Sequence, residues 1–327
     1  MKAIVSREYG SADVLRLEEI EKPAPAPREI LIRVHAASVN PLDWHLMRGT
    51  PKPIRLFAGL RRPKKPRLGV DFAGTIEAIG GDVTQFRPGD AVFGACDGAF
   101  AEYVCAPASS VVRKPDRLSF VQAAAVAIGG LTALQALRDK GHVQPGQKVL
   151  INGAAGGVGT FAVQIAKWIG ATVTGVCSTA NVEMVRHIGA DLVVDYTQED
   201  FAAAGRLYDV IFDLVGNRSL TEFRRVLGPT GTFISCGGGG PDKRTSELLG
   251  PVVGQMVTAR FTRQKLVGIL AKRDQADLQL LSELMDSGKV TPVIDHCYGL
   301  AQTAEAIRYL ELGHARGKVV ITVDSEA

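Results

Sequence analysis

The segment 148–159 reads KVLINGAAGGVG, and it decides the fold of the chain. A run of apolar strand residues ends at Asn152, a glycine-rich turn follows, and residues 157–169 have the apolar pattern of a helix. This order lets bare backbone approach a pyrophosphate at the positive N-terminus of a helix. It predicts dinucleotide binding, with a tight structural turn as the alternative. The residues expected to hold the diphosphate are Gly153, Ala155, Gly156, Gly157, Val158 and Gly159.

Strands and helices alternate after this turn. After it come the strand TVTGVC, a helix at 182–188, the strand LVVDY, then YDVIFDLVG, a helix at 220–227 and GTFISCGG. Strands this continuously apolar are covered on both faces, so the sheet is expected to be parallel with helical crossovers. The pattern indicates a doubly wound α/β nucleotide-binding domain.

Residues 1–119 show a different pattern, in which short strands are separated by turn residues. Strands are expected at 3–5, 29–37, 69–79, 90–93 and 101–105. A buried helix pair is expected from Ser119 to Lys140. Near the end, the strand candidate 265–270, a helix at 274–287, a helix at 301–312 and the strand KVVITV follow. The last helix and strand have no place in the nucleotide fold. We therefore expect a discontinuous β-rich domain, 1–120 plus 290–327, and a nucleotide-binding domain, 121–289.

Composition sets limits on partners and compartment. The 327 residues carry a net charge of +4, which gives no global indication of a nucleic-acid or membrane partner. None of the five cysteines forms a CxxC pair, and no apolar leader or membrane span is visible, so a cytoplasmic protein with reduced thiols is expected. One stretch is exceptional: 52–67 has seven Lys or Arg, four flanking or internal prolines and no acid. It is interpreted as a solvated loop, with contact to an anionic ligand or partner as the alternative.

Cofactor choice is read at the end of the strand TVTGVC. An NAD site usually presents a carboxylate there to the ribose 2′-hydroxyl, but this chain has Ser178, Thr179 and Ala180. The two hydroxyls could donate hydrogen bonds to a 2′-phosphate, which favours NADPH; either could instead cap the next helix. Further contacts are expected where other parallel strands end, at Val215-Gly216 and at Gly237-Gly238.

Several segments together resemble a known family. AASVNPLDWHLMRG, PRLGVDFAGTI, VTQFRPGDAVFG, INGAAGGVGTFAVQIAK and GHARGKVVI are similar to the medium-chain dehydrogenase/reductase superfamily, in its zinc-free quinone oxidoreductase branch and near the reticulon-4-interacting-protein-like reductases. The resemblance covers essentially the whole chain. It implies a GroES-like β-rich catalytic domain joined to a Rossmann domain, with the active site in the cleft between them.

The resemblance also bears on metal content. Zinc-dependent relatives place ligands in the segment here occupied by Ser38-Val39-Asn40, at Val70 and near Ile128, and all three positions carry non-ligands. No metal is therefore expected, because catalytic zinc needs about three nitrogen or sulfur protein ligands. Without a Lewis acid the substrate must already be an electrophile, such as a quinone or an α,β-unsaturated carbonyl compound.

By the same resemblance, Asn40 and Thr132 face the nicotinamide and the cleft, and Asp43 follows in the same loop. Trp44 and His45 lie near the place where relatives carry a tyrosine that lines the substrate pocket. Each residue also has a structural alternative. Asn40 could be a turn residue, Thr132 could bond to the backbone of its own helix, and His45 could be structural or exposed to solvent. Tyr196 resembles a tyrosine beside the 2′-phosphate, or is a sheet-end aromatic. Arg316 and Lys318 resemble residues of the cofactor cleft, or are surface charges.

The sequence thus predicts an NADPH-dependent oxidoreductase that transfers hydride to a small electrophile. An enoyl-thioester reductase of the same fold and a non-catalytic NADPH-binding redox sensor are the alternatives. A homodimer is also considered, because the strand candidate 265–270 suits pairing between two copies.

Overall fold

The computed structural model describes residues 1–203, 205–236 and 263–323. The chain divides into two compact units. Unit 1 comprises 1–131, 273–288 and 292–327, and unit 2 comprises 132–272 and 289–291. In the described part of the chain, no helix combines the length and the apolar character needed to cross a membrane.

Unit 1 is β-rich. Its strands are β1 (Lys2–Val5), β2 (Arg16–Glu19), β3 (Glu29–Val39), β4 (Asp71–Ile79), β5 (Ala91–Ala95), β6 (Tyr103–Pro107), β7 (Val111–Arg113), β14 (Ile294–Gly299) and β15 (Lys318–Thr322). Its helices are α1 (Pro41–Arg48), α2 (Arg55–Ala58), α3 (Phe120–Ala124), α9 (Gln275–Asp286) and α10 (Thr303–Glu311), and α4 (Ala127–Gln135) begins in it. Short 3-10 turns lie at Ala12–Val14, Lys52–Ile54, Ala108–Ser110 and Leu300–Gln302.

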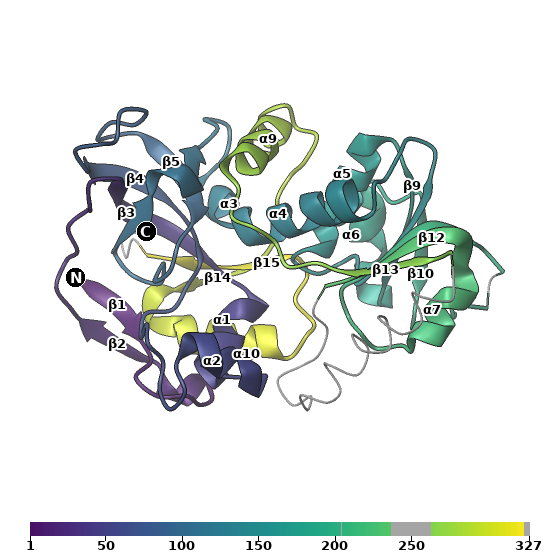
Figure 1. Ribbon diagram of the computed structural model, residues 1–327, viewed down its shortest axis with the longest axis horizontal. Coiled ribbons are helices and arrows are strands. Elements are labelled where there is room, and N and C mark those ends of the chain that lie inside the picture. Colours follow the sequence, from purple (N-terminus) through teal and green to yellow (C-terminus); the bar gives the residue numbers. More distant parts are fainter. Residues whose placement is uncertain (204, 237–262, 324–327) are drawn as a thin grey trace. The chain divides into compact units, whose positions relative to one another are not determined.

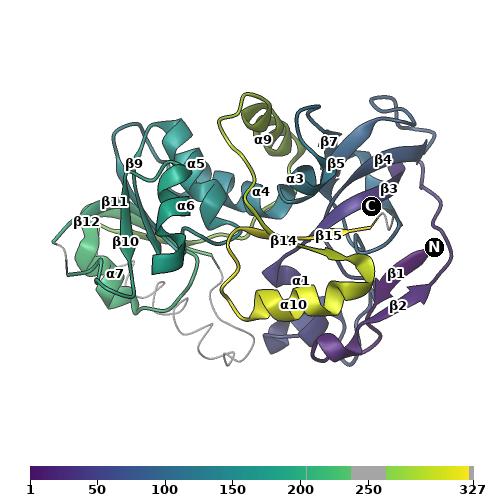
Figure 2. The same ribbon diagram turned by 180° about the vertical axis from the view of Figure 1, so that it is seen from behind.

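The long strand β3 organises the main sheet of unit 1. The strand order is β14-β15-β3-β4-β5-β7, and β6 also pairs with β3 (Figures 1 and 2). Apolar residues of β3 such as Ile30, Ile32 and Val34 are buried in the core, which also takes side chains from α1 and α10. The return of the chain through β15 is what makes this unit discontinuous, because β15 pairs antiparallel with β3.

Unit 2 is built on a parallel sheet. Its elements are the end of α4, a π-helical turn (Ala136–Lys140), β8 (Lys148–Asn152), α5 (Gly159–Ile169), β9 (Thr172–Cys177), a 3-10 turn (Thr179–Asn181), α6 (Val182–His187), β10 (Leu192–Asp195), β11 (Tyr208–Asp213), α7 (Leu220–Val226), β12 (Leu227–Ser235) and β13 (Lys265–Gly268). The order β10-β9-β8-β11-β12-β13 has every neighbouring pair parallel. Helices α5 and α7 lie on opposite sides of this sheet (Figures 1 and 2).

The fold class predicted from the sequence is confirmed. Most predicted elements are present with ends that differ by one or two residues, whereas β2, β7, β14, α1 and α2 were not among them. The helix α9 groups with unit 1, although the predicted boundaries put it in the nucleotide-binding domain. The reason is local: Gln275 donates hydrogen bonds to the carbonyls of Ala108 and Val111, and Ser282 donates one to the carbonyl of Arg113.

Candidate functional site

The glycine turn of unit 2 follows β8 and leads into α5. Gly153 has φ of +88°, a conformation that favours glycine. A Cβ on Gly159 would lie 2.1 Å from the carbonyl oxygen of Gly153, so the turn closes only without a side chain there. The N-cap of α5, Val158, provides no side-chain cap for the first backbone N–H groups. The turn thus presents uncapped N–H groups at the positive end of a helix, which suits a diphosphate.

The loop after β11 lies against this turn. A Cβ on Gly153 would lie 2.8 Å from Cγ2 of Val215, so the structure brings these two predicted cofactor residues together. The buried carboxylate of Asp213 fixes the loop by accepting hydrogen bonds from the N–H groups of Val215 and Gly216, each 3.1 Å long, and from Nδ2 of Asn152 at 2.8 Å. Asp213 was not predicted, although it directly precedes the Leu214-Val215-Gly216 loop. Gly237 and Gly238 lie outside the described residues.

The predicted 2′-phosphate contacts gather where β9 and β10 end. The Ser178 hydroxyl accepts a hydrogen bond from Nδ2 of Asn181, which leaves its own proton to donate. Thr179, however, donates its proton to Oδ2 of Asp195 over 2.5 Å, and that hydrogen bond holds the pKa of Asp195 below its usual value. Tyr196 is half-exposed and follows this carboxylate. The end of β9 has no acid in sequence, but the register with β10 places one beside it, since Asp195 pairs with Cys177.

In unit 1, a buried polar cluster lies where β3, β4 and β15 meet. The register pairs Ser38 with Asp71 and Val39 with Val319. Because β3 and β15 are antiparallel, Asn40, the residue after β3, lies opposite Lys318, the first residue of β15. Lys318 is 3% exposed and Asp71 0%. The Lys318 ammonium donates to Oδ1 of Asn40 over 2.6 Å and lies 3.5 Å from Oδ2 of Asp71. We call Ser38, Asn40, Asp43, Asp71 and Lys318 the buried cluster.

Asp71 is the centre of the buried cluster. Its Oδ2 accepts hydrogen bonds of 3.0 Å from the Ser38 hydroxyl and from Nδ2 of Asn40, and its Oδ1 accepts one of 3.0 Å from the Ile128 N–H. Burial lowers the pKa of Lys318, and the negative charges of Asp71 and Asp43 oppose that effect. The two charges compensate each other away from water, and the amide of Asn40 is held in one orientation between them.

Asp43 belongs to the start of α1. Asn40 is the N-cap of this helix, Pro41 follows it, and the Asn40 N–H donates to Oδ2 of Asp43 over 2.7 Å. The other oxygen, Oδ1, is buried without a hydrogen-bond partner among the described residues. Burial raises the pKa of Asp43 to about 7; the Asn40 N–H counteracts this, and the charge of Asp71 adds to it. Its hydrogen bond to the Asn40 N–H therefore stabilises the start of α1.

The other predicted catalytic residues lie in separate settings. His45 donates from Nδ1 to the carbonyl of Thr50 over 2.7 Å, and burial lowers its pKa. Its face lies against Trp44, with ring centroids 3.7 Å apart. Thr132 is buried in α4, at the first position of unit 2. Arg316 is exposed, and its backbone N–H donates to Asp295; Lys318, the residue two positions on, points inward instead.

Two family descriptions match the chain. Residues 26–116 match the alcohol dehydrogenase GroES-like domain, and residues 188–321 match the zinc-binding dehydrogenase domain. The mitochondrial NAD(P)H oxidoreductase RTN4IP1 of Mus musculus is 34% identical over 99% of this chain and 89% of its own length. The chain belongs to the medium-chain dehydrogenase/reductase superfamily. Within it, the chloroplastic quinone-oxidoreductase QR1 of Triphysaria versicolor is 34% identical, with 98% of each protein covered.

Solved structures place the chain in the same superfamily. The quinone oxidoreductase from Coxiella burnetii superposes with a TM-score of 0.86 at 33% identity, covering 99% of both chains. The Escherichia coli quinone oxidoreductase, solved as a complex with NADPH, superposes with a TM-score of 0.83 at 26% identity, covering 99% and 100%. The prediction of a medium-chain oxidoreductase of the quinone-reductase kind is therefore confirmed.

One of the two matching family descriptions names zinc. A zinc ion does not fit the buried cluster. The Ser38 hydroxyl donates to Asp71, and the buried ammonium of Lys318 already compensates that carboxylate. A divalent cation there would face a buried positive charge and lack nitrogen or sulfur ligands. Across residues 1–203, 205–236 and 263–323, no group of three or more His, Cys, Asp or Glu is placed to hold a metal ion.

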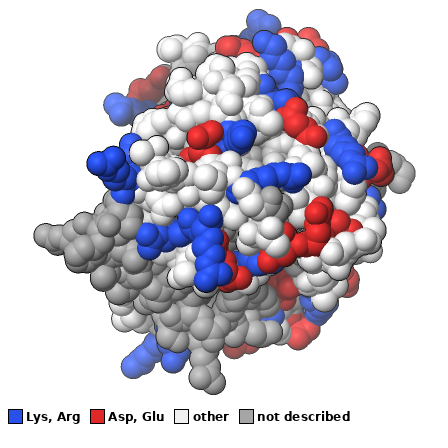
Figure 3. Space-filling view, turned by 90° about the vertical axis from the view of Figure 1, so that its right-hand side faces the viewer, with Lys and Arg blue, Asp and Glu red and all other residues white. Residues whose placement is uncertain are grey.

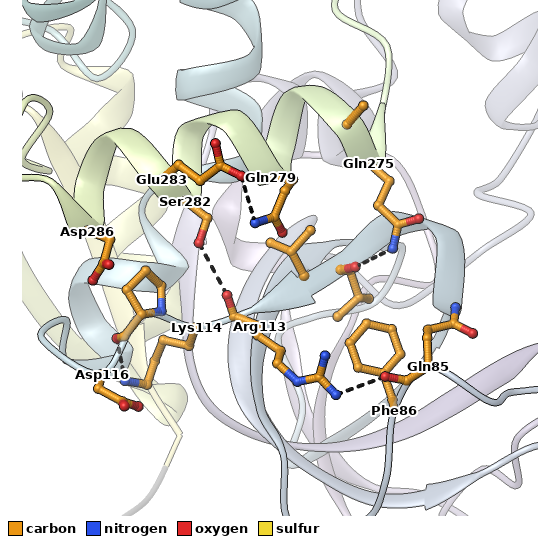
Figure 4. A pocket seen from close by; sticks show the side chains of 14 residues that line it. Gln85, Phe86, Arg113, Lys114, Asp116, Gln275, Gln279, Ser282, Glu283 and Asp286 are labelled. Carbon is orange, nitrogen blue, oxygen red and sulfur yellow. Dashed lines mark hydrogen bonds between the residues drawn. The ribbon is translucent and has the colours of Figure 1, made fainter.

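An open groove of about 790 Å³ in unit 1 of this superfamily member is not part of the candidate site. It lies between α9 and the β7 edge of the sheet, as Figure 4 shows. The Arg113 guanidinium points along the groove to the carbonyl of Gln85, and Glu283 accepts from Gln279 on the facing helix. The groove lining includes none of the residues predicted to act on cofactor or substrate.

Proposed function

We propose that the protein is a zinc-independent, NADPH-dependent reductase of quinones or α,β-unsaturated carbonyl compounds. One observation carries this proposal: a superfamily member with an intact dinucleotide turn has a buried Lys318–Asp71 pair, and Asp71 is bonded to Ser38 and Ile128, near which the resemblance places the ligands of zinc-dependent relatives. The name of the 2-methylene-furan-3-one reductase of Solanum lycopersicum, 33% identical over 98% of this chain, supports a conjugated carbonyl substrate.

The residues of unit 2 are suited to hold the cofactor. The N–H groups at Gly157 and Val158 would bind the diphosphate. The loop fixed by Asp213 would form one wall of the site beside the nicotinamide. When bound, the reduced nicotinamide supplies a hydride. An electrophilic substrate needs only close approach and a donor to its developing negative charge, so no Lewis acid is required.

In unit 1, the buried cluster positions the start of α1. Lys318 and Asp71 hold the side-chain amide of Asn40, and the Asn40 backbone holds Asp43. This arrangement would keep the residues that follow, Trp44 and His45, in one place beside the substrate. Asn40 thus acts as a positioning residue, since its own amide groups are engaged within the protein.

The preference for NADPH over NADH rests on Ser178, whose proton is available to a phosphate oxygen, and on the half-exposed ring of Tyr196. Asp195 opposes it, because a carboxylate repels a phosphate. We expect Ser178→Asp to weaken NADPH far more than NADH. Equal weakening of both cofactors would contradict the assignment of Ser178 to the 2′-phosphate.

We further propose a cytoplasmic homodimer that pairs through β13. This strand is an edge of the described sheet, and Leu270, two residues beyond it, is 91% exposed. Edge strands with unpaired backbone groups are ready templates for pairing with another copy. Light scattering coupled to size exclusion should give twice the chain mass, and a Leu266→Pro variant, in which the replaced N–H faces away from β12, should give the monomer.

The decisive experiment follows NADPH absorbance during incubation with quinones, enones and enoyl thioesters. We expect turnover of the first two classes, and full activity after exhaustive chelation of the protein. Turnover of enoyl thioesters alone would assign the alternative substrate class. Tight NADPH binding without turnover of any class would contradict an enzymatic role, and loss of activity on chelation would contradict zinc independence.

A further inference from the structure

The segment 52–67, which we call the basic loop, displays large apolar side chains to solvent. Leu56 is 65% exposed, Phe57 83% and Leu60 69%, and all three lie in or next to the short helix α2. Three large apolar side chains within five residues form a local patch, unlike the single exposed leucines found on most surfaces.

The basic loop is held firmly at its base. Tyr9 donates from its hydroxyl to the carbonyl of Gly59 over 2.6 Å, and Arg55 donates to the carbonyls of Arg48 and Gly49. The Lys64 N–H closes the loop on the carbonyl of Ala58 at 2.7 Å. The inward-facing groups thus anchor the loop, and the apolar patch is presented on the outside of unit 1.

Positive charge surrounds the patch. No Asp or Glu occurs between Asp43 and Asp71 in sequence. Lys65 is paired with Asp97, and Arg55 is used in anchoring. The remaining exposed cations are Lys52, Arg61, Arg62 and Lys64. In the described part of the chain, none of these four forms an ion pair.

Other described surface differs from this loop. On the face drawn in Figure 3, Lys and Arg side chains are interspersed with Asp and Glu, so positive charge is compensated locally. The net charge of +4 averages over such surface and hides the uncompensated basic loop. The expectation that no membrane partner exists was drawn from that average, and it does not apply to this loop.

The chemistry of the loop fits one kind of partner. Exposed leucine and phenylalanine beside uncompensated Lys and Arg are the features of segments that lie in the interface of an anionic bilayer. Nucleic acid would use the cations but offers no apolar environment for Leu56 and Leu60, and base stacking needs aromatic rings, of which the patch has one. A loop that is only solvated gives no reason for three large apolar side chains to be exposed together.

We propose that the basic loop binds the surface of anionic membranes. The apolar residues Leu56, Phe57 and Leu60 enter the boundary between headgroups and acyl chains, and the four cations contact the headgroups. Binding needs neither cofactor nor turnover, so this proposal stands independently of the proposed enzymatic function.

The test is co-sedimentation of the whole protein with vesicles. We expect binding to phosphatidylcholine vesicles that contain phosphatidylserine, weakened by added salt, and no binding to phosphatidylcholine alone. Arg61→Gln with Arg62→Gln should weaken binding by about 25-fold, at about fivefold per cation. The double change to Lys should bind as well as the wild type, because it keeps both charges.

The apolar contribution is tested separately. Phe57→Ser with Leu60→Ser should lower vesicle affinity by at least about tenfold. The matched control for apolar exposure is Leu207→Ser, and the control for charge is Lys140→Gln with Lys289→Gln; these three residues are exposed and lie outside the basic loop. Both control variants should bind within about twofold of the wild type.

Insertion is checked with Phe57→Trp. Brominated lipid should quench its fluorescence in anionic vesicles, whereas the fluorescence of Leu207→Trp should not be quenched. Absence of binding at low salt, equal binding to neutral vesicles, or loop variants that bind like the wild type would overturn the proposal. Tighter binding to RNA than to anionic vesicles, with the same dependence on Arg61 and Arg62, would assign the loop to nucleic acid and overturn it as well.

Discussion

Replacing Lys318 by Met should destabilise unit 1 strongly. The change removes a buried ammonium and leaves the fully buried Asp71 carboxylate without a counter-charge and Oδ1 of Asn40 without its donor. Breaking a buried pair in this way costs about 3–5 kcal/mol. The three hydrogen bonds that Asp71 keeps from Ser38, Asn40 and Ile128 favour the lower end of that range.

The assay is urea unfolding followed by tryptophan fluorescence in a Trp168→Phe background. That background leaves only Trp44, which is buried in the core of unit 1, of the two tryptophans. Combining Lys318→Met with Asp71→Asn should recover about 2 kcal/mol or more, because neither charge is then left alone. The control, Lys65→Met, breaks a surface pair and should cost under about 1 kcal/mol. A cost under about 1 kcal/mol for Lys318→Met, or additive effects in the double variant, would refute the reasoning.

Three further results are expected. Gly159→Ala should lower dinucleotide affinity more than tenfold in calorimetry, as its Cβ would lie 2.1 Å from the Gly153 carbonyl oxygen and reshape the turn; unchanged affinity would argue against the diphosphate site. Burial raises the folded-state pKa of Asp43 to about 7, above its unfolded value, so the folded state holds the proton more tightly. The free energy of unfolding should therefore fall as pH rises from about 4 to 7, by on the order of 4 kcal/mol at most. Asp43→Asn should flatten that dependence in urea titrations, and an unchanged slope would exclude Asp43 as its source. Asp195→Asn should improve NADPH binding several-fold more than NADH binding; no change in the ratio would place the 2′-phosphate elsewhere.

Local patterns predicted most of the fold. The glycine turn before α5, the apolar strands of unit 2 and the returning strand β15 are each read from a few consecutive residues. β7 was missed because its three residues show too little alternation, and α1 was missed because Asn40, which precedes Pro41, was interpreted as a turn residue and not as the start of a helix. The position of α9 was misjudged because its partners, such as Ala108, are more than 160 residues away.

The candidate site could be predicted only where its members are neighbours in sequence. The buried cluster depends on two strand registers, which the sequence alone does not give. Without them, Asp71 was only the residue after Val70, where zinc-dependent relatives have a ligand, and Lys318 was predicted as a cofactor contact. Asp195 was missed for a related reason: the cofactor preference was read at Cys177 and the residues after it, while the carboxylate beside Thr179 comes from the next strand.

The placement of β15 between β14 and β3 has a consequence for biosynthesis. Every strand of unit 2 leaves the ribosome before residues 318–322 do, so the parallel sheet can form while β3 still waits for its partner. During that interval Asp71 has no Lys318 to neutralise it. The nascent chain therefore carries an incomplete, partly apolar sheet until residues 318–322 have emerged, and during that interval the unpaired edge of β3 is open to aggregation.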